Sequence, residues 1–147
     1  MEDSISGRDT AQEAGEGFHV SLHLPAEPGQ LTVLRKTVFQ LPRVSDKLKM
    51  DLHVMIEEIF VNICSYGYPE GSGTVDVSFD VQDAVTIVFT DSGKPFDPTK
   101  DLPNMAEYDI MHTIGGVGRF LTFQLADDYS YEHVGDKNVL RLVKKLD

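Results

Sequence analysis

The sequence predicts an α/β (α+β) domain in which helices pack against a β-sheet, because it alternates between two hydrophobic periodicities. Five segments have the alternating or β-branched apolar pattern of strands, and three have apolar residues at helical spacing. At 147 residues, the chain has the length of one domain and is long enough to bury a substantial core.

The elements are expected in the order strand, two helices, two strands, helix, two strands. Their predicted ranges are residues 18–24, 28–41, 46–66, 75–81, 84–91, 115–125, 129–134 and 138–146. Pro42 ends the first helix, and Ser45 is a suitable N-cap for the second. The run 84–91 is nearly continuous in apolar and β-branched residues, which favours a central strand that forms a hairpin with 75–81.

Residues 1–17 are predicted to be a disordered acidic tail, and residues 18–147 to be a single domain. The tail has five acids, one base and few large apolar residues. It lacks the apolar core of a signal peptide, and no stretch of the chain approaches the length of apolar residues that spans a membrane. We therefore expect a cytoplasmic protein. The single cysteine, Cys64, excludes an internal disulfide and is expected to be a small buried apolar residue.

The charge balance limits the possible partners. Thirteen basic residues against twenty-four acidic ones give a formal net charge of −11 at pH 7. Nucleic acids and anionic membranes are bound by basic surfaces, so we expect neither as a partner. A small anionic ligand remains compatible, because a few local hydrogen-bond donors suffice to hold it.

The first candidate site is on the second helix, where Glu58 and Asn62 are four residues apart and share a face. A carboxylate beside an amide oxygen suits a divalent cation or a proton transfer. The alternative is a partly buried Asn62 that caps a neighbouring backbone, with Glu58 in solvent. Glu57 points about 100° away from this face.

Two further candidates follow along the chain. Asp91 ends a buried strand, and Gly93 allows a ligand to approach the backbone closely, so the carboxylate could accept a hydrogen bond from an exocyclic amine. The alternative here is an Asx-turn. Residues 115–118 (GGVG) open the last helix, whose free N–H groups favour an anion, or they form a flexible junction. Together the three segments provide the cation ligand, base acceptor and phosphate cradle of a magnesium–nucleotide site.

The order and wording of these segments resemble the ATP-binding domain of the gyrase, chaperone, histidine-kinase and MutL (GHKL) superfamily, the Bergerat fold. The resemblance is closest to small bacterial anti-sigma factors that are serine/threonine protein kinases. Residues 57–68 (EEIFVNICSYGY) resemble the N-box, residues 91–98 (DSGKPFDP) the first glycine box, and residues 114–146 the second glycine box and closing strands. This resemblance implies a two-layer sandwich, with a mixed, mostly antiparallel sheet covered on one face by about three helices.

The resemblance also implies roles for the candidate residues. Glu58 would be the catalytic general base for a substrate serine, and Asn62 would hold the Mg²⁺ ion that bridges the ATP phosphates. Asp91 would accept a hydrogen bond from the adenine amine, and Gly93 would let the ring lie close.

The remaining implied ligand contacts lie in the last third of the chain. Gly115, Gly116, Val117 and Gly118 would cover the phosphates of ATP, and Asn138 would support Asp91 through a water molecule. The implied partners are a sigma factor and a STAS-type anti-anti-sigma protein that carries the serine, and the implied assembly is a homodimer.

The sequence departs from the better-known family members near the glycines. Those members have a basic residue shortly before the glycines, whereas here the stretch before them is 112–114 (HTI) and Arg119 follows them. Tyr66 stands where some members have a histidine, four residues after the N-box asparagine, Asn62. Three alternatives to the kinase remain. They are a nucleotide-sensing binding module without effective kinase activity, a histidine-kinase-type catalytic domain, and an acidic α/β domain that binds no nucleotide.

Overall fold

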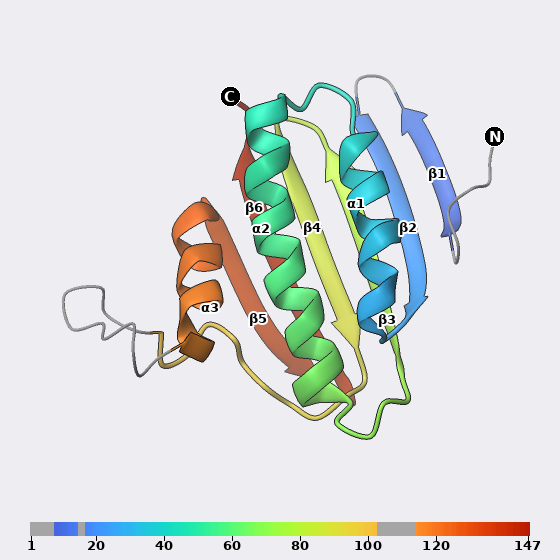
Figure 1. Cartoon of the computed structure of the whole chain (residues 1–147). Coiled ribbons are helices and arrows are strands. Elements are labelled where there is room, and N and C mark those ends of the chain that lie inside the picture. Colours follow the sequence, from blue (N-terminus) through green and yellow to red (C-terminus); the bar gives the residue numbers. More distant parts are fainter. Residues whose placement is uncertain (1–7, 15–16, 103–113) are drawn as a thin grey trace.

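The computed structural model describes residues 8–14, 17–102 and 114–147, which form a two-layer α+β fold (Figure 1). One sheet has the strand order β1-β2-β3-β4-β6-β5. The strands are β1 (Arg8–Ala14), β2 (Gly17–Pro25), β3 (Thr74–Val81), β4 (Ala84–Asp91), β5 (Asp128–Val134) and β6 (Lys137–Lys145). The α-helices are α1 (Leu31–Phe39), α2 (Asp46–Asn62) and α3 (Ile114–Leu125). The predicted fold class is confirmed, although all the described strand pairs are antiparallel, so this sheet is not mixed.

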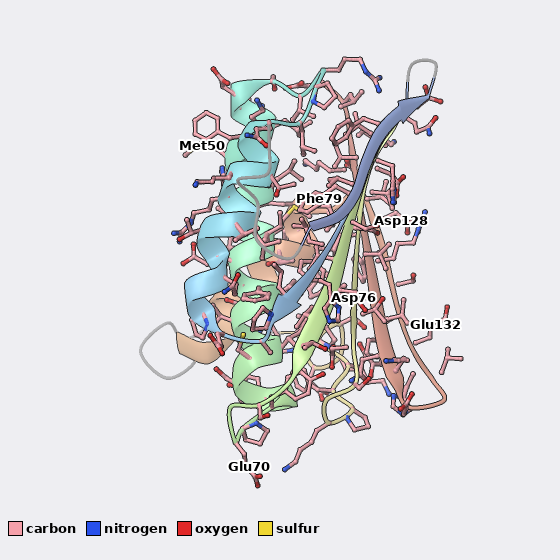
Figure 2. The ribbon with its side chains drawn as sticks, turned by 90° about the vertical axis from the view of Figure 1, so that its right-hand side faces the viewer. Met50, Glu70, Asp76, Phe79, Asp128 and Glu132 are labelled. Carbon is pink, nitrogen blue, oxygen red and sulfur yellow. The ribbon has the colours of Figure 1, made fainter. Side chains whose placement is uncertain are left out.

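The three helices cover one face of the sheet, and the opposite face is open (Figures 1 and 2). Every second side chain of β3 and β4 is buried, as the predicted period of two requires. Phe79 and Phe89 from the sheet and Phe60 from α2 are fully buried between the layers. Asp76 and Asp128 point away from the helices (Figure 2). None of the helices described here is long and apolar enough to cross a lipid bilayer.

The two histidines of β2, His19 and His23, pair with aspartates of β3 on the open face of the sheet. His19 Nδ1 lies 2.7 Å from Asp80 Oδ1, and His23 Nδ1 lies 2.5 Å from Asp76 Oδ1. Each histidine is directly opposite its aspartate in the β2–β3 register. The two histidines therefore take part in separate cross-strand pairs.

The interpretation of residues 1–17 as a disordered tail is wrong for Arg8–Ala14. This segment is strand β1, which pairs antiparallel with β2 and places Ala14 opposite Gly17. The backbone N–H and C=O groups on this edge of β2 need partners, and a polar segment supplies them as well as an apolar one does. The acidic composition of the segment therefore did not prevent strand formation.

Helix α2 begins where the sequence indicated. The Ser45 side chain caps it, with its oxygen accepting a hydrogen bond from Leu48 N at 3.1 Å. The helix is α-helical as far as Asn62 and continues as a π-helical turn, Ile63–Gly67. Such turns often occur at functional sites. This one brings Gly67 O within 2.9 Å of Lys94 N, in the segment after β4.

Cys64 lies in this π-helical turn and is buried, as expected from the sequence. Burial raises the pKa of its thiol to about 11. The thiol therefore stays protonated at neutral pH and packs as a small apolar side chain.

Candidate functional site

Glu58 and Asn62 interact directly on the last two turns of α2. Asn62 Nδ2 donates a hydrogen bond to Glu58 Oε2 at 2.7 Å, so the shared face predicted from their spacing is confirmed. Glu57 lies on another face, where Arg35 Nη2 approaches Glu57 Oε1 at 3.3 Å. Two adjacent glutamates of one helix therefore have separate environments, and of the two only Glu58 is hydrogen-bonded to Asn62.

Asp91 is the last residue of β4, and only 7% of the residue's surface is exposed. Its Oδ1 accepts hydrogen bonds from Gly93 N at 2.8 Å and from Asn138 Nδ2 at 3.0 Å. The bond from Gly93 is the Asx-turn considered from the sequence. The Asn138 contact is direct, whereas the resemblance implied an intervening water.

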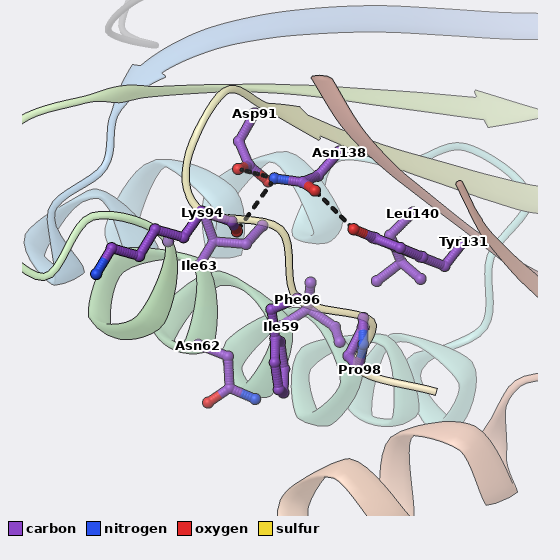
Figure 3. Close-up of a pocket in the computed structure, with 11 residues that line it drawn as sticks. Ile59, Asn62, Ile63, Asp91, Lys94, Phe96, Pro98, Tyr131, Asn138 and Leu140 are labelled. Atoms are coloured by element: carbon purple, nitrogen blue, oxygen red, sulfur yellow. Dashed lines mark hydrogen bonds between the residues drawn. The ribbon is translucent and has the colours of Figure 1, made fainter. Parts of the chain in front are cut away.

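Asn62, Asp91 and Asn138 line one pocket between α2 and the sheet, whereas Glu58 is not among its lining residues and connects to it through Asn62 (Figure 3). Its other walls come from α2 and its π-helical turn, from the segment after β4, and from β5 and β6. The lining residues are Ile59, Asn62, Ile63, Gly67, Asp91, Lys94, Phe96, Pro98, Tyr131, Asn138 and Leu140. The pocket thus combines an apolar wall with a few convergent polar groups, which is typical of a small-molecule site.

One glycine of the last helix, Gly118, lies against the carboxylate of Glu58 on α2. Gly115, Gly116 and Val117 form the first turn of α3, which begins at Ile114. Gly118 packs so closely on Glu58 that a Cβ atom at this position would lie only 1.8 Å from Glu58 Oε1. The structure therefore brings Gly118, of the glycine-rich segment 115–118, into contact with the Glu58–Asn62 pair. Any side chain at position 118 would displace the Glu58 carboxylate.

Arg119 holds the segment that follows Gly93. Arg119 Nη1 donates to Pro98 O at 3.2 Å and to Lys100 O at 2.9 Å, and its guanidinium lies 5.7 Å from the Phe96 ring centroid. The Phe96 ring in turn contacts the Tyr66 ring at a centroid distance of 5.5 Å. The Arg119 guanidinium therefore connects helix α3 to the segment after β4 through the backbone carbonyls of Pro98 and Lys100.

Tyr131 and Gly67 line the pocket, and Tyr68 contacts the residue that follows Asp91, but none of the three was singled out from the sequence. Tyr131 OH donates to Asn138 Oδ1 at 2.6 Å, and Tyr68 OH accepts from Ser92 N at 2.8 Å. Burial raises the pKa of both phenols above their ordinary value of 10. The predicted hairpin of the last two strands indicates the position of Tyr131. His133 is opposite Asn138 in this hairpin, and Tyr131, two residues earlier on β5, therefore lies on the same face of the sheet as Asn138.

The residues present fit a magnesium ion that is bound together with phosphate. Since Asn62 Nδ2 is engaged by Glu58, Asn62 Oδ1 is the part of the amide left for a cation, and an amide oxygen suits Mg²⁺. The part of the chain that the structure describes contains no group of three or more His, Cys, Asp or Glu residues that could hold a metal. A cation at Asn62 would therefore take most of its ligands from phosphate and water.

Comparison with known families agrees with this geometry. Residues 24–144 match the family described as Histidine kinase-like ATPase domain, and no curated protein matches the chain. The chain therefore belongs to the histidine kinase-like ATPase family, within the GHKL superfamily. Domains of this kind bind ATP, usually with Mg²⁺, so the family assignment supports a nucleotide as the ligand of the pocket.

Proposed function

We propose that this chain is an ATP-dependent protein serine/threonine kinase of the anti-sigma type. The observation that carries the proposal is one pocket lined both by a buried carboxylate, Asp91, and by the amide of Asn62, which is hydrogen-bonded to Glu58. The first suits an adenine amine, and the second suits the phosphate end of the nucleotide. Gly115, Gly116, Val117 and Gly118 would cover the phosphates from the first turn of α3.

The proposed reaction uses Glu58 as the general base. The hydroxyl of a substrate serine gives its proton to the Glu58 carboxylate while its oxygen forms a bond to the γ-phosphorus of ATP. The bond between that phosphorus and the β–γ bridging oxygen breaks, and ADP leaves with the electron pair. Asn62 would hold Mg²⁺, which would supply charge neutralisation at the phosphates. The Asn62–Glu58 hydrogen bond keeps the base beside the cation ligand.

The proposed protein partners follow from the anti-sigma resemblance. The substrate serine would belong to a STAS-type anti-anti-sigma protein, and the chain would sequester a sigma factor as a homodimer. The acidic net charge of −11 supports a protein partner with basic surface over a nucleic acid.

A second candidate is a nucleotide-sensing module that binds a partner without effective phosphoryl transfer. The contacts of Arg119 favour it, since this guanidinium binds the carbonyls of Pro98 and Lys100. A cation engaged in this way contributes less to transition-state charge than one aimed at the γ-phosphate.

Phosphoryl transfer distinguishes these two candidates. The chain is incubated with Mg²⁺, γ-labelled ATP and the anti-anti-sigma protein encoded nearby, and the products are analysed by mass spectrometry. The kinase proposal predicts a phosphoserine on the partner. Tight ATP binding without any label on the partner would contradict the kinase and support the sensing module.

An Asp91→Asn variant is expected to lose about 1–3 kcal/mol of ATP binding free energy, the cost of a spoiled charged hydrogen bond. The Asn oxygen would accept from Gly93 N and Asn138 Nδ2, which leaves an NH₂ group facing the adenine amine. Titration calorimetry measures the affinity, and wild-type binding should also fall steeply when Mg²⁺ is removed by chelation.

Asp83→Asn is the matched control for this charge change. Asp83 is an exposed residue of the β3–β4 turn, at the opposite end of β4 from the pocket. Its substitution should leave ATP affinity as in the wild type. Unchanged affinity in Asp91→Asn would remove this carboxylate from the proposed site.

A further inference from the structure

We infer that the Tyr131 hydroxyl selects for a nucleobase with an exocyclic amine, by orienting Asn138 and through it the carboxylate of Asp91. This inference rests on the proposed ATP site. Tyr131 on β5, Asn138 at the start of β6 and Asp91 at the end of β4 form a chain of hydrogen bonds across three adjacent strands (Figure 3). Tyr131 acts through this chain, so it is a positioning residue.

The orientation of the Asn138 amide follows from its surroundings. Asn138 Nδ2 faces three oxygens, namely Asp91 Oδ1 at 3.0 Å, Gly93 O at 3.1 Å and Lys94 O at 3.4 Å. A flipped amide would place its own oxygen against these three acceptors. Asn138 is 6% exposed, so water could not relieve that repulsion.

Tyr131 supplies the donor that holds this orientation from the other end of the amide. Its hydroxyl donates to Asn138 Oδ1 at 2.6 Å. Since burial raises the pKa of Tyr131, the phenol keeps its proton at neutral pH and remains a donor. His133 Nδ1 is a second, longer contact of the same oxygen at 3.1 Å, from an exposed residue of β5. The shorter and less exposed contact from Tyr131 is therefore the stronger constraint.

The consequence for Asp91 is that its two oxygens have different roles. Oδ1 is saturated by Gly93 N and Asn138 Nδ2, and no other residue in the described ranges donates a hydrogen bond to Asp91. Oδ2 is left as an acceptor in a pocket that a ligand can enter. An amine at the purine 6-position satisfies this acceptor, whereas a 6-oxo group repels it and a bare 6-position leaves it without a partner.

The test compares two nucleotides that differ only in this amine. The affinities of ATP and purine riboside 5′-triphosphate are measured by titration calorimetry with Mg²⁺ for the full chain and for Tyr131→Phe. Phe keeps the ring that lines the pocket and removes only the hydroxyl. We expect ATP affinity to fall roughly three- to tenfold, the range for one lost hydrogen bond, while the analogue binds as before.

Tyr129→Phe is the matched control, because it removes the same hydroxyl two residues away on the same strand. The Tyr129 ring packs against Phe123 at a centroid distance of 4.7 Å, and its hydroxyl bonds to no residue that the structure describes. This variant should retain both affinities. Thermal melting of all three proteins reports any general loss of structure.

The outcomes separate this inference from the proposal beneath it. A wild-type chain that binds no ATP would overturn the nucleotide site itself. A wild type that binds ATP, with unchanged ATP affinity in Tyr131→Phe, would overturn only the role of Tyr131. So would an equal loss for ATP and the analogue, since that pattern reports a change of pocket shape. A loss confined to ATP supports the inference.

Discussion

A Glu58→Gln variant is expected to bind Mg–ATP as the wild type does and to lose phosphoryl transfer by about 10²–10⁴-fold, the usual contribution of a general base. Glutamine has the same shape and can still accept the hydrogen bond from Asn62 Nδ2, which is 2.7 Å long in the wild type. It cannot accept the serine proton at neutral pH. The measurement is the initial rate of label transfer to the partner, with ATP affinity determined separately by calorimetry.

The neighbouring residue provides the control for this variant. Glu57→Gln makes the same chemical change on the same helix, but Glu57 faces Arg35 at 3.3 Å in an exposed pair. Exposed pairs of this kind contribute little to stability, so both ATP binding and transfer should stay near the wild-type level. Undiminished transfer in Glu58→Gln would exclude Glu58 as the base. Equal losses in both variants would indicate damage to α2 instead.

The elements with strong periodicity were predictable from the sequence, because burial on one face imposes a regular spacing. The strands 75–81 and 84–91 were predicted with almost their observed bounds, since every second residue of β3 and β4 faces the helices. Ser45 fixed the start of α2, because its cap is a local interaction. Strand β1 was missed because pairing of an edge strand is backbone chemistry, which side-chain patterns report weakly.

In the site, too, contacts between residues close in the sequence were predictable, and contacts between distant residues were not. The shared face of Glu58 and Asn62 follows from helical spacing, so the sequence predicted it, whereas the hydrogen bond between them is seen only in the structure. The contact of Gly118 with Glu58 joins residues sixty positions apart and depends on where α3 packs. The Tyr131–Asn138 hydrogen bond depends on the register of one hairpin and on side-chain direction. Such contacts need the tertiary structure, because no local spacing determines them.

A Gly93→Ala variant is expected to lower the free energy of unfolding by about 1–3 kcal/mol, the usual cost of overpacking. A Cβ atom at this position would lie 2.6 Å from Gly67 O and 2.7 Å from Gly67 C, so two backbone segments would have to separate. That movement would break the bond from Lys94 N to Gly67 O, which is 2.9 Å long. It would also disturb the Gly93 N–H that holds Asp91 Oδ1.

Gly93→Ala is expected to weaken ligand binding more than Asp91→Asn does. It would displace the Asp91 carboxylate and would also separate the two backbone segments that meet at Gly67 and Gly93 beside the pocket. We expect ATP affinity to fall by about thirtyfold or more, from the combined cost of overpacking and a lost charged hydrogen bond. Calorimetry measures the affinity, and thermal or denaturant unfolding measures the stability.

Gly67→Ala is the control that makes the stability prediction specific. The two glycines touch each other, yet a Cβ atom at Gly67 would meet its nearest neighbours, Asp91 Oδ1 and Gly93 Cα, at 3.7 and 3.8 Å, which is ordinary contact. Gly67→Ala should therefore melt near the wild-type temperature while Gly93→Ala melts several degrees lower, at roughly 2–4 °C for each kcal/mol lost. Equal melting temperatures for the two variants would show that the backbone contact at Gly93 is not tight. The sequence singled out Gly93 for the close approach of a ligand, whereas the structure places the Gly67 backbone against it, so the different tolerance of the two glycines is a direct test of the packing between the π-helical turn and the segment after β4.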